Sequence, residues 1–268
     1  PQFDPLIVHI AEISELEIIV EPLSAEAKKL IEKFWPGPLT LILRRKSIVP
    51  NIVTAGLETV AVRMPNFDST RDLIRSAGFP LAAPSANTFG KLSPTRVEHV
   101  LQDLGESVEL ILDGEATQYG VESTIVDVSS DRLKILRFGA ISLEQITEVV
   151  GDVEVAIHSS SNPSAPGQLE SHYAPQTPVR LLVSDVPEQM PAALLRLQSK
   201  DDEIEVPGNW AHVEYLSPSG DLREAAARLF DVLHKLDEMR MRAIYVELVP
   251  EIDLGRAIND RLRRAAAS

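Results

Sequence analysis

Residues 80–94, Pro-Leu-Ala-Ala-Pro-Ser-Ala-Asn-Thr-Phe-Gly-Lys-Leu-Ser-Pro, form the stretch around which this chain is organised. Their apolar beginning, Leu81 to Ala83, predicts the end of a buried strand, and Ser93-Pro94 predicts the N-cap and first position of a helix. The loop between them carries Ser85 and Asn87. Loops that join a strand to a helix bind anions in α/β proteins, although a well-capped turn without a ligand would contain the same residues.

The composition is that of a globular protein of one or two domains. The chain has 268 residues, 44% of them hydrophobic and 25% charged, as globular domains do. Its apolar runs are too short to cross a bilayer and its first residues do not resemble a signal peptide, so we expect a cytoplasmic protein with no membrane contact. Because cysteine is absent, disulfides, iron–sulfur clusters and thiolate zinc sites are excluded.

Charge and motifs restrict the function further. A formal charge of −14 argues against a general nucleic-acid binder, since such proteins need basic surface that releases counterions from phosphates. The chain lacks the phosphate-binding Gly-x-x-x-x-Gly-Lys-Ser/Thr loop, the dinucleotide motif Gly-x-Gly-x-x-Gly and the zinc motif His-Glu-x-x-His. Its six histidines do not fall at ligand spacing, so we expect no protein-bound metal.

Three basic or titratable side chains stand at the ends of predicted strands: His9, Arg63 and Arg137. A buried guanidinium is costly without an anionic partner, and either a protein carboxylate or a ligand carboxylate or phosphate could be that partner. Two such arginines beside hydroxyl-bearing loops favour a ligand that has both a carboxylate and a phosphate. His9 could instead be a packed side chain whose hydrogen bonds are made within the protein.

Alternating strands and helices predict two α/β domains joined by a linker. We expect a first domain over 1–156, a Ser- and Pro-rich linker over 157–178, and a smaller domain with a parallel sheet over 179–268. His172 and Tyr173 are costly residues for a passive tether, so we expect the linker to fold over a site. A linker that Tyr173 merely pins to the surface would have the same sequence.

The individual elements follow from hydrophobic period and cap residues. The predicted helices cover 24–34, 69–77, 94–103, 142–150, 188–197, 221–236 and the chain from 254. The predicted strands cover 6–8, 39–43, the apolar run within 54–65 that ends at Arg63, 81–83, 108–112, the second half of 120–128, 133–136, 179–183, 213–216 and 243–249. The basic run Arg261, Arg263 and Arg264 is explained by a favourable interaction of positive charge with the C-terminus of the last helix.

Several motifs, taken together, resemble one family, the Sua5 branch of the Sua5/YrdC family of threonylcarbamoyl-AMP synthases. They are Pro-Leu-Ile-Val-His (5–9), Trp-Pro-Gly-Pro-Leu-Thr (35–40), Thr-Val-Ala-Val-Arg-Met-Pro (59–65), Ala-Ala-Pro-Ser-Ala-Asn (82–87), Gly-Val-Glu-Ser-Thr-Ile (120–125), the turn 137–139, and Ala-Pro-Gly…His-Tyr-Ala-Pro (165–175). The last distinguishes the Sua5 branch from single-domain YrdC proteins. The resemblance implies a YrdC-like twisted open sheet with flanking helices and a smaller Rossmann-like C-terminal domain.

The same resemblance implies an enzyme that joins L-threonine, bicarbonate and ATP into threonylcarbamoyl-adenylate and releases pyrophosphate. We expect Mg²⁺ to accompany the ATP phosphates. The product is passed to a tRNA threonylcarbamoyl transferase, which makes N6-threonylcarbamoyladenosine in tRNA. We expect no stable binding of nucleic acid by this chain.

The resemblance also implies the residues of the site. L-threonine would contact His9, Arg63, Ala83 and Ser123. ATP would contact Asp4, Thr59, Ser85, Asn87, Ser93, Arg137 and Tyr173, and Asp4 stands where the family often has Asn. Arg63 and Ser123 are the residues that we expect to be catalytic, since the displacement at phosphorus depends on positioning and charge stabilisation rather than on a protein nucleophile.

Two departures from the family accompany this match. The Thr-Val-Tyr-Gly and Lys-x-Arg motifs that precede the first matched run are not in this sequence, so we expect a further segment before Pro1. Phe138 stands where the family usually has proline after the strand-end arginine, which frees one φ angle in the turn.

Three other interpretations compete with the synthase. An RNA-binding or ribosome-maturation module of the YrdC type is disfavoured by the charge. Another ATP-dependent carbamoyl transferase could use the same scaffold, but the linker and second domain favour the synthase. A shortened chain that keeps the fold without activity is the third.

Overall fold

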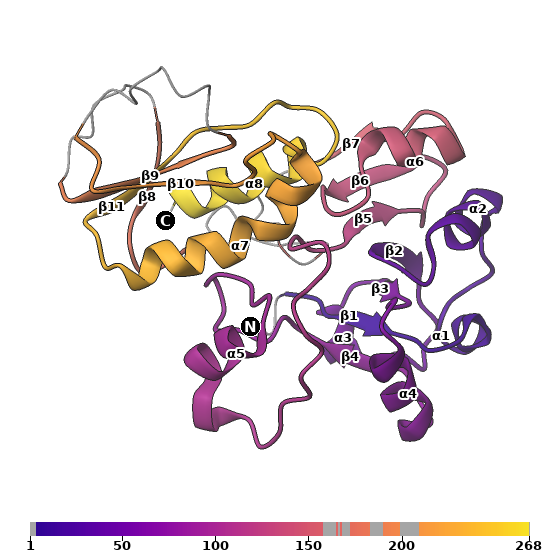
Figure 1. Ribbon diagram of the computed structural model, residues 1–268. Helices are drawn as coiled ribbons and strands as arrows, with labels where there is room; N and C mark the ends of the chain where they lie inside the picture. The colour runs from indigo at the N-terminus through magenta and orange to yellow at the C-terminus, as the bar shows by residue number, and fades with distance from the viewer. Residues whose placement is uncertain are drawn as a thin grey trace. The chain divides into compact units, whose positions relative to one another are not determined.

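The computed structural model describes residues 4–157, 165, 167, 172–182, 190–198 and 209–267. Contacts between Cα atoms divide the chain into two compact units (Figure 1), one made of Pro1–Pro84 and Glu122–Leu169 and the other of Ser85–Val121 and Glu170–Ser268. The second unit thus includes the stretch that begins at Ser85. Most of the predicted linker over 157–178 lies outside the described residues, and the predicted domain limits stay predictions.

The first unit is built on a seven-stranded mixed sheet with the order β4-β1-β3-β2-β5-β6-β7. The strands are β1 (Ile7–His9), β2 (Leu39–Arg44), β3 (Thr59–Arg63), β4 (Leu81–Ala83), β5 (Thr124–Asp127), β6 (Lys134–Arg137) and β7 (Glu154–Val155). The helices are α1 (Leu16–Ile19), α2 (Ala25–Phe34), α3 (Asn51–Thr54), α4 (Asp68–Ala77) and α6 (Leu143–Val150), and a 3-10 turn covers Ile13–Glu15.

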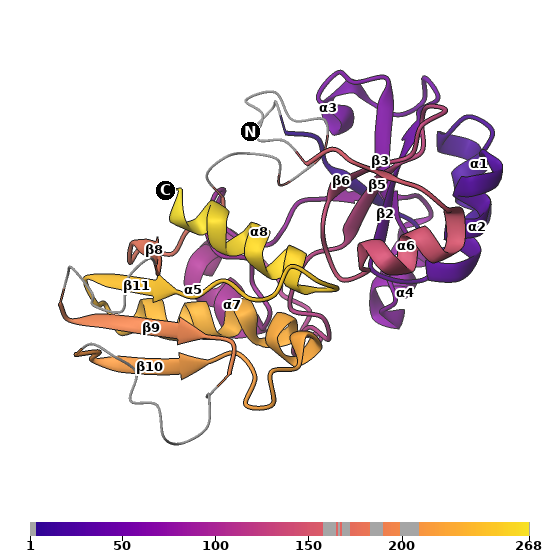
Figure 2. The same ribbon diagram turned by 90° about the horizontal axis from the view of Figure 1, so that it is seen from above.

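Helices α1, α2 and α6 lie on one side of this sheet (Figure 2), where the larger core forms. Alternate residues of β2, Leu39, Leu41 and Leu43, point into that core, as the two-residue period of a strand requires. The predicted caps are confirmed, because Ser24 Oγ accepts from Ala27 N–H at 3.1 Å and Ser142 forms a capping box at α6. The other face of the sheet carries polar residues together with a smaller apolar cluster that includes Ile42 and Ala61.

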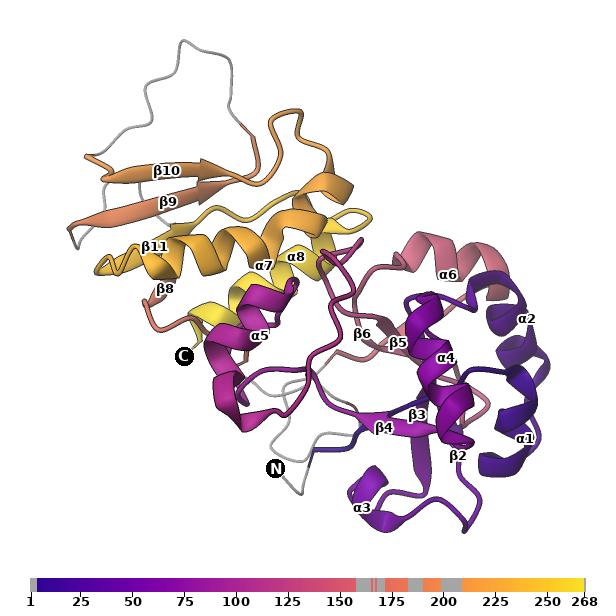
Figure 3. The ribbon, with the colours of Figure 1, turned by 60° about the horizontal axis from the view of Figure 1, so that its bottom comes forward.

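The second unit contains a parallel four-stranded sheet with the order β10-β9-β11-β8 (Figure 3), which confirms the predicted parallel α/β arrangement. Its strands are β8 (Val179–Leu181), β9 (Ala192–Arg196), β10 (His212–Tyr215) and β11 (Ala243–Val246). Its helices are α5 (Val97–Leu104), α7 (Leu222–Glu238) and α8 (Gly255–Ala266), with a 3-10 turn at Gly105–Ser107. Helices α7 and α8 contact each other, and α8 packs along β8.

Two predicted elements are wrong. The helix predicted over 188–197 is a strand, β9, in the residues that the structure describes. All four residues from Ala192 to Leu195 are buried, and a short, continuously apolar run fits a parallel strand covered on both faces better than an amphipathic helix. The strand predicted over 108–112 is absent, because its backbone has no ladder partner in the described part of the chain and Leu110 is 78% exposed.

Two further expectations about the opening stretch need correction. Among the residues that the structure describes, strand β4 pairs only with β1 and forms the edge of its sheet, and Ala82 and Ala83 are exposed, so this is not a buried strand. Helix α5 begins at Val97 rather than at position 94. The backbone that leads into this helix is held by His99, whose Nδ1 accepts a hydrogen bond from Thr95 N–H at 3.2 Å.

No helix among the described residues is both long and apolar enough to span a membrane.

Candidate active site

Five strands of the first sheet each contribute one residue to a single row. In the strand registers His9 is the partner of Arg63, Arg63 of Thr40, Thr40 of Ile125 and Ile125 of Arg137. Register partners point to the same side of a sheet. The row therefore gathers His9, Arg63, Thr40 and Arg137 on the face opposite the main core, where Leu39 and Leu41 point the other way.

An apolar row lies beside this polar row on the same face. Ala83 is the register partner of Ile7, Ile7 of Ala61, and Ala61 of Ile42. Ile42 and Ala61 are buried in a small separate cluster against which Ile7 packs. Ala83, predicted to touch threonine, thus belongs to the face that carries His9 and Arg63.

A buried hydrogen-bond network closes one end of the polar row. Ser123 Oγ lies 2.7 Å from Thr40 Oγ1. Arg137 donates from Nη2 to the carbonyl oxygen of Ser123 at 2.9 Å and to its hydroxyl at 3.0 Å, and from Nε to the same carbonyl at 3.1 Å. Thr40, Ser123 and Arg137 are each at least 95% buried, with exposures of 0%, 2% and 5%. The network holds the Ser123 hydroxyl in one orientation.

The loop 35–38 positions Arg63. Arg63 Nε donates to the carbonyl oxygen of Gly37 at 3.1 Å, while Gly37 N–H donates to Met64 O at 2.8 Å. Trp35 Nε1 donates to Leu39 O at 2.8 Å and ties the loop to the start of β2. A side chain at position 37 would collide with the backbone, because a Cβ there would lie 2.2 Å from Phe34 O. This explains why glycine stands at that position.

His9 is held neutral. Burial and the neighbouring charge of Arg63 lower its pKa to about 4. Its Nδ1 has no hydrogen-bond partner among the described residues. A neutral imidazole beside a guanidinium adds no positive charge to the row and can donate or accept one hydrogen bond.

Asp4 and Thr59, both predicted to contact ATP, differ in their relation to the polar row. Burial raises the pKa of the Asp4 carboxyl, although the charge of Arg137 lowers it. Thr59 is the first residue of β3 and the register partner of Arg44, so it lies at the opposite end of that strand from Arg63. The charge of Asp4 therefore interacts with that of Arg137, a member of the polar row. Thr59 lies away from this row.

The other predicted ATP residues, Ser85, Asn87, Ser93 and Tyr173, belong to the second unit. Asn87 Nδ2 donates to the carbonyl oxygens of Thr88 and Lys91 at 3.0 and 3.2 Å, which makes the loop compact. Ser85 is exposed, whereas Ser93 is buried. Ala174 N–H donates to Gly90 O at 2.9 Å and so brings the Tyr173 segment beside the Asn87 loop.

Tyr173 is packed inside the second unit. It is 2% exposed, its φ angle is +63°, and its ring lies 5.5 Å from that of Phe230 of α7. The guanidinium carbon of Arg261 lies 5.0 Å from the centroid of the Tyr173 ring. Arg261 is completely buried, so interaction with the end of the last helix does not account for it. Arg264 is likewise buried and bonds Asp260.

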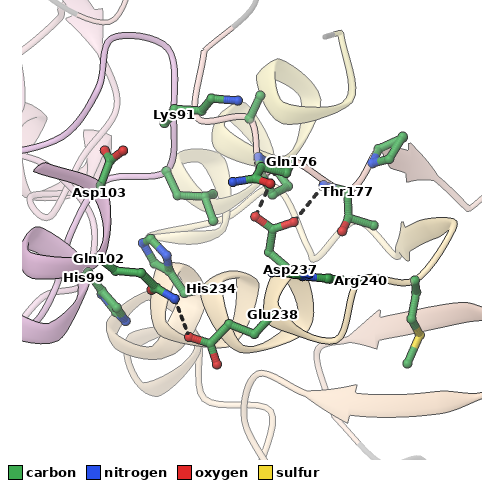
Figure 4. A pocket seen from close by; sticks show the side chains of 15 residues that line it. Lys91, His99, Gln102, Asp103, Gln176, Thr177, His234, Asp237, Glu238 and Arg240 are labelled. Atoms are coloured by element: carbon green, nitrogen blue, oxygen red, sulfur yellow. Dashed lines mark hydrogen bonds between the residues drawn. The ribbon is translucent and has the colours of Figure 1, made fainter. Parts of the chain in front are cut away.

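A cavity of about 440 Å³ lies within the second unit, between α5, α7 and the chain at 174–178 (Figure 4). The rings of His99 and His234 stack on one another at 3.8 Å, and burial lowers the pKa of each. Asp237 accepts from the backbone N–H groups of Gln176 and Thr177. Sequence patterns gave no signal for these residues, because they come from segments far apart in the chain.

One residue of the first unit's polar row, Thr40, and one residue of the loop that positions Arg63, Gly37, were also missed. Thr40 and Gly37 lie within the matched run 35–40, but no role was expected for either. The motif itself was the available signal: Thr40 bonds Ser123 and Gly37 bonds Arg63. Among the described residues no group of three or more His, Asp or Glu side chains is placed to hold a metal ion.

The comparisons with known proteins cover the whole chain. The Sua5_yciO_yrdC family profile, described as "Telomere recombination", matches residues 1–139. A second profile, described as "Threonylcarbamoyl-AMP synthase, C-terminal domain", matches residues 141–267.

Comparison with individual relatives supports the same family. The chain is 37% identical to the threonylcarbamoyl-AMP synthase of Pyrococcus abyssi, with 99% of this chain and 81% of that protein aligned. It is 40% identical to the threonylcarbamoyl-AMP synthase of Bacillus subtilis, over 99% of this chain and 80% of that protein. The crystal structure of the P. abyssi Sua5 complexed with L-threonine superposes with a TM-score of 0.88 at 35% identity, covering 99% and 81% of the two chains. The chain therefore belongs to the Sua5/YrdC family and carries both domains of its Sua5 branch.

Proposed function

We propose that this protein is an L-threonylcarbamoyladenylate synthase, which joins L-threonine, bicarbonate and ATP and releases pyrophosphate. The polar row His9–Arg63–Thr40–Arg137 supports this function most directly, because it places cationic and hydrogen-bonding groups together on one face of a sheet. Resemblance over the whole chain to synthases, one of them crystallised with L-threonine, supports the same substrate.

Arg63 would bind the carboxylate of threonine. Its guanidinium is oriented by Gly37 O, which accepts from Nε, and a planar guanidinium can bind a carboxylate by two parallel hydrogen bonds. Neutral His9, its register partner, would hydrogen-bond the amino acid without repelling an ammonium group. Ser123 would contact the threonine from one end of the row, and the small side chain of Ala83, on the edge strand β4, would leave room for the ligand.

Arg137 would face the ATP phosphates. Other parts of ATP would contact Asp4, Thr59, Ser85, Asn87, Ser93 and Tyr173. Mg²⁺ would be coordinated by the phosphate oxygens of ATP rather than by protein ligands alone, as is usual for Mg²⁺ in nucleotide sites. Bound in this way, the ion would neutralise charge on the phosphates. We propose the limits 1–156, 157–178 and 179–268 for catalytic domain, linker and C-terminal domain, with the linker folding over the site.

In the proposed reaction the threonine amine, as a free base, attacks the carbon of bicarbonate, and water leaves as a carbamate forms. A carbamate oxygen then attacks the α-phosphorus of ATP; the new P–O bond forms as the bond to pyrophosphate breaks. Arg63 and Ser123 position the carbamate, and Arg137 stabilises charge on the phosphates. No protein nucleophile is required.

The mixed anhydride product is reactive toward water, so it would be passed without delay to a tRNA threonylcarbamoyl transferase, in the cytoplasm. Stable binding of tRNA to this chain is not part of the proposal, in agreement with a charge of −14.

The test is threonine-dependent release of pyrophosphate from ATP by the full natural gene product, with and without bicarbonate. Release that needs both threonine and bicarbonate is the expected result. Release that needs carbamoyl phosphate in place of bicarbonate would favour the carbamoyl transferase instead. No release under any condition, accompanied by tight RNA binding, would favour the RNA-binding module.

A further inference from the structure

One face of helix α7 contacts two segments of the second unit that carry predicted ATP residues. Asp231, His234 and Asp237 recur at intervals of three residues and so lie on one side of the helix. The segments they meet are 93–96, which includes Ser93, and 173–177, which includes Tyr173. Figure 4 shows His234 and Asp237 side by side at the wall of the cavity.

Asp237 makes the most specific of these contacts. Its Oδ2 accepts from Gln176 N–H at 2.9 Å and its Oδ1 accepts from Thr177 N–H at 2.7 Å. Two charge-assisted bonds to successive amides fix the direction of the backbone, not only its distance. The chain immediately before them is anchored too, because Ala174 N–H donates to Gly90 O at 2.9 Å.

His234 and Asp231 hold the other segment. The carbonyl oxygen of Ser93 can only accept, so His234 donates to it from Nε2, at 3.2 Å. Asp231 pairs with Arg96, at 2.7 Å from its Nε and 3.0 Å from its Nη2. One helix face therefore sets the paths of two loops that are 80 residues apart in the sequence.

We propose that Asp237 is a positioning residue for the ATP site. It does not contact ATP; it fixes the backbone after Tyr173 so that the Tyr173 segment stays on the loop that carries Asn87 and Ser93. This role rests on the proposed function, and it gives the C-terminal domain a part in catalysis. Loss of positioning is costly even when every contacting side chain is present.

The experiment compares Asp237→Ala, Asp237→Asn and the matched control Lys235→Ala in the full natural gene product. Lys235 lies on the same helix but pairs with Glu214, at 2.6 Å. The readouts are the KM for ATP and the KM for threonine in pyrophosphate release, and amide hydrogen exchange at Gln176 and Thr177.

For Asp237→Ala we expect the KM for ATP to rise about tenfold, while the KM for threonine stays within about twofold, because His9, Arg63 and Ser123 belong to the other unit. Exchange at Gln176 and Thr177 should become faster. Asp237→Asn, which keeps one acceptor, should fall between wild type and Asp237→Ala, and Lys235→Ala should match wild type.

An active wild-type enzyme whose Asp237→Ala variant keeps its KM for ATP would overturn the positioning role alone. Equal rises in both KM values would overturn it as well, since they indicate general loss of structure. A wild-type protein that releases no pyrophosphate would instead overturn the proposed function, and the role with it.

Discussion

Arg137 donates hydrogen bonds to both the carbonyl and the hydroxyl oxygen of Ser123, at 2.9 and 3.0 Å from the same nitrogen. The pair joins a residue predicted to face ATP to one predicted to face threonine. Because Arg137 is 5% exposed and Ser123 2%, water cannot readily replace either bond. At the end of the polar row, the residue proposed to contact ATP and the residue proposed to contact threonine therefore hold each other in place.

Replacement of Ser123 tests this link. Ser123→Ala removes the hydroxyl that bonds Thr40 and Arg137 and should cost about 1–3 kcal/mol of folding stability, as loss of a buried hydrogen bond to a charged group does. The rate of pyrophosphate release should fall as well. Urea denaturation and pyrophosphate release measure the two effects. Ser129→Ala, at a partly exposed hydroxyl that bonds only Asp127 among the described residues, is the control; a stability loss as large there would show that burial of the network is not the reason.

Arg63 carries the proposed carboxylate contact. Arg63→Lys keeps the charge but loses the planar fork, so we expect the KM for threonine to rise by about tenfold or more. The KM for ATP should change little in comparison. Steady-state kinetics with either substrate varied measures the split. An unchanged KM for threonine would remove Arg63 from the proposed threonine site.

The titration of His9 should weaken the fold in mild acid. Burial and the neighbouring charge of Arg63 lower the folded-state pKa of His9 from its ordinary 6.5 to about 4. Above pH 6.5 the imidazole is neutral in both states and has no effect. Between pH 6.5 and 4 only the unfolded chain takes up the proton, so folding stability falls by roughly 1.4 kcal/mol for each pH unit, and below pH 4 the loss is complete.

Unfolding measured at several pH values, in wild type and in His9→Gln, isolates this effect. Glutamine keeps a polar side chain but does not titrate in this range. The variant should therefore lose less stability between pH 6.5 and 4 than wild type. Parallel pH profiles for the two proteins would mean that His9 is not held neutral.

Gly139 should tolerate no side chain. A Cβ there would lie 2.3 Å from Glu122 O, 2.4 Å from Thr124 N and 2.5 Å from the carbonyl carbon of Ser123. Gly139→Ala should push this backbone apart and destabilise the protein by about 3 kcal/mol or more. It should also impair threonine binding, because Ser123 moves.

Gly78→Ala is the matched control for that variant. Gly78 ends α4 with a φ angle of +76° and has open space around it, so the substitution should cost only about 1 kcal/mol, for the strained backbone. Equal losses at the two positions would contradict the predicted collision at Gly139. Both variants are compared by urea denaturation.

Much of the fold could be predicted from local patterns. The strand 39–43 and the helices that begin after Ser24, Ser142 and Asp221 are confirmed, because hydrophobic period and cap residues act within one or two turns. The helix predicted over 188–197 failed because a short apolar run has no period that separates a buried strand from a helix.

The sequence by itself determined the family, the order of the motifs and the residue types at the ends of the strands, because these are properties of short segments. Only the tertiary structure decided that His9, Arg63, Thr40 and Arg137 form one row, since register joins strands that are distant in the chain. It likewise decided that Asp237 caps the backbone after Tyr173. The physical reason is the same: a hydrogen bond between remote segments exists only after burial has brought them together, and no local pattern encodes it.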